Sequence, residues 1–412
     1  MIPEVPDDAD LLSMMPVVSY GDGVDGPEAF GGHRCGARHL SSVLPAISAA
    51  IGHPVATDVH PDPAQLQRAL GLPDVERAVV VLVDGLGFWN LVSRAGHAPY
   101  LRSLLGEDAG GRPLSTCIPS TTAAAMGVFG TGTCPGMTGM TGYTQLNPRT
   151  GELCQLIQFR DAPKPTELQR RPTVFESLVA QGVRVSSCGL SRFADSPLTR
   201  AALRGSEYLS GDSPAARIAL ASRASRTPGL TYVYVRDIDK TGHSDGWDSQ
   251  AWVAALERVD ARLARLRRSL PQGTLIVIVA DHGMVSSDSA RRIDVAAEPD
   301  LSEGVRLIGG EPRAPMLYVE KGTNPEAVAE RWRRRLEGHA MVALRGEAVD
   351  AGLLGPVEPR VLDMLGDVLV WAADRTTIVD SRTQSDMATR LPGVHGSRTM
   401  LETDIPCLVD VA

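Results

Sequence analysis

The segment TLIVIVADHG, residues 274–283, decides the fold of this chain. Its uninterrupted aliphatic run is typical of a strand buried on both faces, as in parallel sheets. Three further β-rich runs are bounded by turn residues: AVVVLVDG (78–85), VRVSSCGL (183–190) and TYVYVRDID (231–239). Helical patterns lie between the runs, most clearly at 252–270. This alternation predicts a doubly wound α/β fold with a mostly parallel central sheet.

The bulk composition describes a globular chain that does not bind nucleic acids generally. Of 412 residues, 43% are hydrophobic and 22% are charged, which suffices for a sizeable core. The formal net charge of −8 argues against a nucleic-acid polymer as partner, because affinity for phosphate backbones needs a basic excess. The one dense basic run, RWRRR at 331–335, is interpreted as the solvated face of a helix.

No targeting or membrane segment is expected from the sequence. The first residues have neither a basic region nor a long apolar region of the kind a secretory signal needs, and no stretch approaches the ~20 apolar residues of a membrane span. The six cysteines are scattered and contain no C-x-x-C pair, so we expect a cytoplasmic protein with reduced thiols. Residues 1–40 are rich in Gly, Pro and Asp, which predicts an irregular N-terminal arm.

Acidic residues follow three of the four predicted strands. Asp84 ends the first run, Asp237 and Asp239 follow the third, and Asp281 ends the fourth. Doubly wound sheets place their functional sites at the carboxyl ends of the strands, so these side chains are expected to meet. A single Asp in such a position is commonly only a helix cap or a turn former. Three strands that end in acids favour a site.

Histidines accompany these acids. His243 follows Asp239 by four residues across a predicted Gly-containing turn, His282 is adjacent to Asp281, and the third histidine stands between glycines in LPGVHGSR (391–398), where it could also be a plain surface residue. Three carboxylates and three imidazoles suit two divalent cations with open positions for a substrate. Two such cations can clamp an in-line displacement at phosphorus. The six candidate ligands are Asp84, Asp239, His243, Asp281, His282 and His395.

Five segments in order resemble the alkaline phosphatase superfamily, and most closely its nucleotide pyrophosphatase/phosphodiesterase branch. They are VVLVDGLG (80–87), PSTTAAAMGVFGTG (119–132), DKTGHSDG (239–246), VADHGM (279–284) and GVHG (393–396). The resemblance implies an alkaline-phosphatase-like three-layer α/β sandwich. We expect a catalytic domain over 41–412, with a small inserted lobe at about 295–390 beside the active site.

The resemblance also assigns roles. It implies that Asp84, Asp281 and His282 hold one metal, and that Asp239, His243 and His395 hold the second. Zinc is the usual metal of the family, and manganese or iron would suit the same ligands. Thr122 would be the nucleophile, forming a phospho-threonine that water then hydrolyses. A hydroxyl at the first turn of a helix gains from the helix dipole, which supports Thr122 independently.

Neighbouring residues are interpreted differently. Ser120 and Thr121 are expected to be caps or turn residues. Cys117 resembles the start of a sulfatase signature, but the register fails, so sulfatase chemistry is not expected and this cysteine is interpreted as packing. Tyr143 stands where the family commonly has an Asn at the phosphate site, which makes it a candidate substrate-binding or packing residue. Phosphomonoesterases of the superfamily use an additional Arg or Lys against the doubly charged phosphate. The sequence does not place this residue by spacing; Arg160, Arg192 and Arg236 are weak candidates, and a surface role is preferred for them.

These features predict a two-metal hydrolase that cleaves phosphodiester or pyrophosphate bonds of small molecules such as nucleotides. A phosphomonoesterase or phosphonate hydrolase on the same scaffold would also fit, as would a non-catalytic metal-binding relative. The correctly spaced Thr122 argues against the last of these. The oligomeric state does not follow from the sequence.

Overall fold

The computed structural model describes residues 2–13, 19–23, 36–106 and 109–412. Its centre is a six-stranded sheet of order β18-β8-β1-β7-β5-β6. The strands are β1 (Arg77–Val83), β5 (Val185–Gly189), β6 (Glu207–Ser210), β7 (Gly229–Val235), β8 (Leu275–Val279) and β18 (Cys407–Val411). Every neighbouring pair is parallel except β18 with β8. The prediction of a mostly parallel α/β sheet is confirmed.

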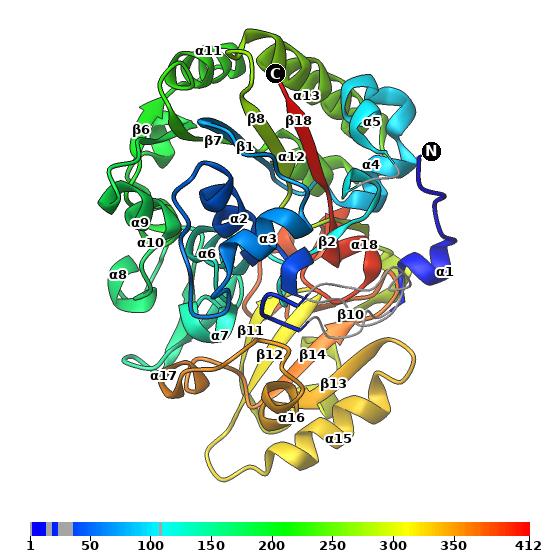
Figure 1. Cartoon of the computed structure of the whole chain (residues 1–412). Helices are drawn as coiled ribbons and strands as arrows, with labels where there is room; N and C mark the ends of the chain where they lie inside the picture. The colour runs from blue at the N-terminus through cyan, green and yellow to red at the C-terminus, as the bar shows by residue number, and fades with distance from the viewer. Residues whose placement is uncertain (1, 14–18, 24–35, 107–108) are drawn as a thin grey trace.

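Helices cover both faces of this sheet (Figure 1). One group, whose members contact one another, comprises α2 (Val43–Ala50), α6 (Thr122–Thr131), α9 (Val174–Ala180) and α10 (Pro197–Ala202). The other group comprises α5 (Pro99–Leu104), α11 (Pro214–Ala224) and α13 (Gln250–Ser269). With both faces covered, the strands lose contact with water. All residues of β8 are buried for this reason, as their aliphatic composition predicts.

Helix α13 shows how the sequence pattern produces this packing. The side chain of Ser249 caps its first turn by accepting a hydrogen bond from the Trp252 N–H. Its apolar stripe, which includes Leu256 and Leu263, is buried against the sheet. Asp260 is also buried, and its carboxylate accepts the Leu101 N–H of α5 at 2.7 Å. The helix therefore both covers the sheet and fixes the neighbouring helix.

A second, antiparallel sheet lies beside the central one (Figure 1). Its order is β11-β12-β14-β13, formed by β11 (Val305–Glu311), β12 (Ala314–Val319), β13 (Ala340–Leu344) and β14 (Val368–Ala372). Helix α15 (Pro325–Arg335) packs on it through the buried Trp332 within a separate apolar cluster. The outward arginines of α15 form ion pairs, such as that between Arg333 and Glu347 at 2.6 Å. The basic run therefore forms a solvated helix face.

Shorter elements complete the described part of the chain. The helices are α1 (Asp8–Leu11), α3 (Pro63–Ala69), α4 (Phe88–Ser93), α7 (Pro135–Thr138), α8 (Pro165–Leu168), α12 (Asp237–Asp245), α14 (Pro299–Ser302), α16 (Arg345–Asp350), α17 (Pro359–Leu362) and α18 (Met400–Thr403). The strands are β2 (Leu114–Ser115), β3 (Thr144–Asn147), β4 (Glu152–Gln155), β9 (Val285–Ser286), β10 (Arg292–Asp294), β15 (Thr377–Val379), β16 (Gly393–Val394) and β17 (Asp404–Ile405).

Two predictions from the sequence concern the N-terminal arm and membrane-spanning helices. Much of the expected arm at residues 1–40 lies outside the described residues, which omit 14–18 and 24–35. Within the described ranges, none of the helices combines the length and the apolar character that crossing a bilayer requires.

Candidate functional site

The carboxyl ends of three central strands bring the predicted acids together. Strands β1 and β7 pair in register up to Val83 and Val235, and β8 flanks β1 on the other side. The segments that follow these strands are joined by hydrogen bonds. The Asp239 N–H donates to the Asp84 carbonyl at 3.1 Å. The Gly85 N–H donates to the Asp281 carboxylate at 3.0 Å. The expected convergence of these acids at one edge of the sheet is therefore observed.

The local structure at Asp239 and His243 differs from the sequence expectation. A Gly-containing turn was expected between them, but both residues lie on helix α12. Side chains four residues apart share one face of a helix, and His243 Nε2 lies 3.2 Å from Asp239 Oδ1. Gly242 packs closely on Met284, since a Cβ atom at this position would lie 2.2 Å from the Met284 sulfur and that side chain would have to move.

Two clusters of ligand atoms form at this edge. In each, one ligand atom per residue lies within 4.8 Å of the others: the first cluster joins Asp239, His243 and His395, and the second joins Asp84, Asp239 and His282. Asp239 therefore belongs to both clusters. Asp281 stands outside this second group, although its Oδ2 is 3.5 Å from His282 Nε2. The structure thus gathers all six predicted ligands, but it places Asp239 between the clusters.

The three imidazoles share one hydrogen-bonding arrangement, in which Nδ1 contacts a backbone carbonyl. Nδ1 of His243 lies 2.8 Å from the Gly393 carbonyl, Nδ1 of His395 is 2.9 Å from that of Ser120, and Nδ1 of His282 is 2.9 Å from that of Gly283. A carbonyl only accepts, so Nδ1 of each ring carries a proton and donates it. In the neutral ring, this leaves the lone pair on Nε2, which faces the carboxylates. Metal-binding histidines are held in this way.

Unsatisfied carboxylate oxygens provide a test of whether cations fit here. Asp84 Oδ1, Asp239 Oδ1 and Asp281 Oδ2 are buried and have no hydrogen-bond partner among the described residues. Burying such oxygens without compensation is costly. Divalent cations with oxygen and nitrogen ligands would satisfy all three, so the residues present fit a metal centre.

The pKa values of these groups reflect their burial and mutual repulsion. Burial raises the pKa of Asp84, and the nearby Asp281 and Asp239 raise it further. Burial raises the pKa of Asp239 as well, but the three nearby imidazoles, His243 foremost, together outweigh burial and lower the pKa. The pKa of His395 is lowered by burial and by the adjacent imidazoles. His395 stacks on His282 with ring centroids 3.6 Å apart, so a charge on both rings is disfavoured.

Thr122 lies beside these clusters. It is the first residue of α6, and its Oγ1 is 3.2 Å from His282 Nε2. The sequence predicts that the two residues before it are caps or turn residues, and Thr121 is at the cap position, although neither side chain bonds to the N-terminus of the helix. Thr121 occupies the N-cap position without a side-chain cap hydrogen bond, and the Ser120 hydroxyl donates to the Ser397 carbonyl at 2.7 Å. The N-terminus of α6 therefore keeps its free N–H groups next to the Thr122 hydroxyl.

A cavity of about 600 Å³ opens over Thr122. Tyr143 lines the cavity and is 43% exposed, and its role in substrate binding stays a prediction. Arg192 and Arg236 also line the cavity. Arg192 is exposed, which agrees with the surface role that the sequence favours, whereas Arg236 is half-buried. Arg160 is exposed and is not part of the lining. Cys117 is buried, as expected of a packing residue.

The sequence did not reveal two groups that support the site. The first is Tyr234, whose hydroxyl donates to Asp84 Oδ2. The signal was present in TYVYV (231–235), because alternate residues of a strand share a face and both tyrosines line the cavity. The second is a buried pair, Arg313 and Glu402, which joins segments too far apart in the chain to be matched by spacing.

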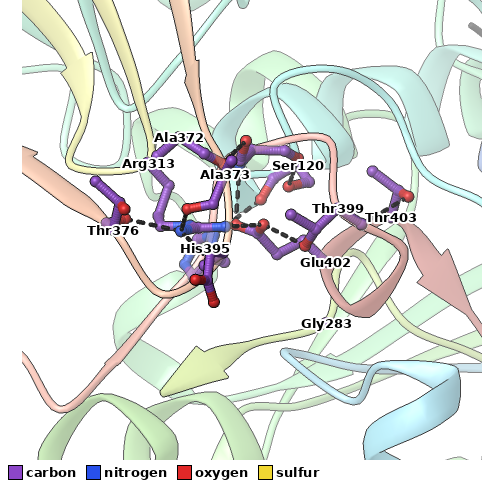
Figure 2. A network of polar contacts seen from close by, with 12 residues as sticks. Ser120, Gly283, Arg313, Ala372, Ala373, Thr376, His395, Thr399, Glu402 and Thr403 are labelled. Carbon is purple, nitrogen blue, oxygen red and sulfur yellow. Dashed lines mark hydrogen bonds and ion pairs between the residues drawn. The ribbon is translucent and has the colours of Figure 1, made fainter. Parts of the chain in front are cut away.

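Figure 2 shows this buried pair and its surroundings. The Arg313 guanidinium contacts both oxygens of Glu402, at 3.0 and 2.7 Å. Glu402 Oε1 also accepts the Ser397 N–H at 3.0 Å, and the Glu402 carbonyl accepts the Gly283 N–H at 2.8 Å. These contacts hold the segments that carry His282 and His395. The second sheet is thus tied to the site through the β11–β12 turn that carries Arg313.

Comparison with solved structures identifies the same architecture in phosphorus-handling enzymes. Murine ectonucleotide pyrophosphatase/phosphodiesterase 5 superposes with a TM-score of 0.64 at 17% identity, covering 81% of this chain and 87% of that one. Phosphonoacetate hydrolase from Sinorhizobium meliloti 1021, in complex with phosphonoformate, gives a TM-score of 0.61 at 20% identity and covers 82% and 90%. At these identities, the likeness shows a shared fold.

Sequence comparison gives one partial and one extended match. A phosphopentomutase from Methylobacterium nodulans is 42% identical over 69 residues, which is 17% of each chain, so the match covers only a small part of that relative. The family model for type I phosphodiesterase/nucleotide pyrophosphatase matches residues 78–398. That range contains Thr122 and all six predicted ligands, and it spans most of the sequence. The chain belongs to the type I phosphodiesterase/nucleotide pyrophosphatase family of the alkaline phosphatase superfamily.

Proposed function

We propose that this protein is a metal-dependent hydrolase that cleaves phosphodiester or pyrophosphate bonds of small molecules such as nucleotides, with Thr122 as the nucleophile. One observation carries the proposal. Thr122 Oγ1 lies 3.2 Å from His282 Nε2, and Thr122 lines the same cavity as Asp84, Asp239, His243 and His395. A hydroxyl in that position meets the geometric requirement for an activated nucleophile.

We propose two divalent cations as cofactors, zinc by preference, with manganese or iron as substitutes. Asp84, Asp281 and His282 would hold one, and Asp239, His243 and His395 the other. When bound, such cations supply positive charge that lowers the pKa of the nucleophile and neutralises phosphate oxygens. The position of Asp239 between both clusters supports a closely spaced pair of cations.

The residues of the chain act as follows. The Thr122 hydroxyl loses its proton to solvent, and Oγ1 attacks phosphorus as the bond to the leaving group breaks. The leaving group departs with the bonding electron pair as an oxyanion, or takes up a proton from solvent, and a phospho-threonine remains. The free N–H groups of the first turn of α6 favour the negative charge that develops there. Water then attacks phosphorus from the side that the leaving group vacated. This step releases phosphate or a phosphate monoester and returns the hydroxyl to Thr122.

Phosphonate hydrolysis is the second candidate reaction. The similarity in fold to a phosphonoacetate hydrolase favours it over phosphomonoester hydrolysis. The murine protein is also described in an inactive threonine-to-alanine form in complex with AMP, which supports the proposal of an essential threonine and a nucleotide ligand for this chain. The choice between the reactions depends on substrate assays.

Two further assignments complete the proposal. We propose that residues 295–390, with their own antiparallel sheet and apolar cluster, form an inserted lobe of a catalytic domain over 41–412. We also propose a reducing compartment such as the cytoplasm, because the five cysteines among the described residues are free and buried.

The test compares Thr122→Ala with the unchanged protein after loading with zinc or manganese. Bis-p-nitrophenyl phosphate, p-nitrophenyl phosphate and phosphonoacetate serve as substrates, and metal content is measured on the same samples. We expect Thr122→Ala to lower kcat on the best substrate by about 10³-fold or more at unchanged metal content. Thr227→Ala, at an exposed position, is the matched control. Undiminished turnover by metal-loaded Thr122→Ala would refute the proposed role and favour a different nucleophile.

A further inference from the structure

Two guanidinium groups line the cavity that contains Thr122. Arg192 lies on a short 3-10 helix, η5 (Ser191–Phe193), which follows β5. Arg236 lies between the end of β7 and the start of α12. Both line the same cavity of about 600 Å³ as Thr122 and Asp84, although they come from segments after different strands. The cavity therefore has a cationic part besides its acidic floor.

Neither guanidinium forms an ion pair within the described ranges. Asp237, the acid next to Arg236, is instead paired with Arg262 at 2.9 Å. Asp195, two residues after η5, is paired with Arg200 at 3.7 Å. Asp212 is close enough to Arg192 for their charges to interact, but its carboxylate accepts hydrogen bonds from the N–H and the hydroxyl of Ser191, at 3.0 and 2.7 Å. The acids close to both arginines are thus already engaged.

The two arginines differ in their exposure but present the same chemistry. Arg236 is half-buried, whereas Arg192 is exposed and stacks over the ring of Phe193, with 4.8 Å between its Cζ and the ring centroid. Stacking orients the planar group and leaves its N–H donors free at the edge. A half-buried guanidinium without a counter-ion gains most from an anion that binds it through two N–H groups.

Two acids also line this cavity, but they are not available to pair with the guanidinium groups of the two arginines. Asp84 and Asp239 face cations in the proposed mechanism, so they do not serve as partners of the arginines. A substrate whose only negative group is the reacting phosphodiester would be bound by the proposed metal centre and would not need the two arginines. We propose that Arg192 and Arg236 form an anion subsite, and that the substrate carries a second negative group, a phosphate or a carboxylate, away from the phosphorus that Thr122 attacks. This inference rests on the proposed function.

The experiment uses pairs of substrates that differ only in the second anion. The first pair is thymidine 5′-(p-nitrophenyl phosphate) with and without a 3′-phosphate. The second pair is p-nitrophenyl phosphate esterified with a carboxyethyl or an ethyl group. Both members of each pair release p-nitrophenolate from the same kind of diester. The quantity measured is the ratio of kcat/KM within each pair, and the two pairs separate a phosphate from a carboxylate preference.

We expect the unchanged metal-loaded protein to prefer an anion-bearing member by about tenfold or more, mainly through KM. Arg236→Ala is expected to lower this ratio severalfold, and the double variant Arg192→Ala/Arg236→Ala to bring it close to one. Arg236→Lys keeps a charge without the planar fork and is expected to restore part of the ratio. The control is Arg200→Ala on α10, which is exposed, pairs with Asp195 at 3.7 Å and lies outside the cavity lining.

Two outcomes would overturn the subsite. The first is an active protein with a ratio of one for both pairs. The second is a double variant with an unchanged ratio. If kcat/KM then falls equally for both members of each pair, the arginines bind the reacting phosphate itself. If no p-nitrophenyl diester is turned over, the proposed function fails separately. Calorimetric binding of thymidine 3′,5′-bisphosphate against thymidine 5′-phosphate then gives the same ratio, and equal affinities would refute the subsite.

Discussion

The Arg313 guanidinium and the Glu402 carboxylate meet in a double hydrogen bond inside the protein, and both side chains are fully buried. Because neither charge is solvated by water, each is stabilised by the opposite charge of its partner. Removing one leaves the other without compensation, which typically costs about 3–5 kcal/mol.

Glu402→Gln is therefore expected to destabilise the fold by about 3–5 kcal/mol, measured by denaturant unfolding of the metal-free protein. The matched control is Asp386→Asn, which removes a carboxylate that is 83% exposed and paired with Arg390. For such a pair, we expect a change below about 1 kcal/mol. Equal effects of the two substitutions would contradict a special role for the buried pair.

Gly85 is expected to be intolerant of a side chain. Its φ of +72° disfavours other residues, and an added Cβ would lie 2.8 Å from Asp239 Cβ. Gly52 has a similar φ of +80° but open space around it, so Gly52→Ala reports the backbone cost alone, about 1 kcal/mol. We expect Gly85→Ala to exceed this cost and to lower metal content as well. Matching unfolding free energies and full metal content in both variants would contradict the contact with Asp239.

Tyr234→Phe is expected to make metal binding more sensitive to acid. Burial and neighbouring acids raise the pKa of Asp84, while the hydrogen bond from Tyr234 lowers it. Without that bond, the pKa rises further, so Asp84 becomes protonated at a higher pH and no longer binds a cation. The pH at which half of the metal is lost should shift upward. Tyr100→Phe removes a hydroxyl bonded to Asp410 and is expected to leave this pH unchanged.

Burial of His39 is expected to lower the free energy of unfolding in acid. Burial and the nearby His60 lower the pKa of His39 to about 3, below its ordinary value of 6.5. Because the folded pKa is depressed, the neutral ring contributes stability above pH 6.5 that is lost as the pH falls from 6.5 towards 3. At pH 5, the loss from this group amounts to about 2 kcal/mol.

The variant His39→Asn tests this contribution. Nδ1 of His39 accepts the Ser41 N–H at 3.1 Å, and an Asn oxygen can replace that acceptor without titrating. Unfolding free energies measured between pH 7 and pH 5 should fall less steeply in the variant. His60, whose pKa is also lowered, accounts for a remaining slope. Parallel curves for the two proteins would rule out titration of His39 as a cause.

The main elements of the fold could be predicted because each depends on local composition. The aliphatic run at 275–279 cannot be solvated, so it forms a buried strand, and the acids after such strands meet at its carboxyl edge. The helix at Asp239–His243 was missed because DKTGHSDG contains glycines and polar residues that favour turns. Packing against α13 and β16 stabilises that helix instead.

Features that depend on long-range contacts could not be predicted from spacing. The position of Asp239 between both clusters requires the relative orientation of α12 and β1. The pairing of Arg313 with Glu402 requires the second sheet to lie against the site, and the placement of Arg192 and Arg236 requires the shape of the cavity. In each case, the residue types fit several environments, and only the tertiary structure selects one.

The position of His395 after the second sheet has a consequence for biosynthesis. On the ribosome, β1, β7 and β8 emerge together with five of the six proposed ligands before the segment GVHG is made. Until that segment docks, the Ser120 carbonyl lacks the imidazole it accepts from, and the cluster around Asp239 is open on one side. A nascent chain therefore presents one proposed ligand set in full, Asp84, Asp281 and His282, while the other still lacks His395, and complete loading follows translation of the second sheet.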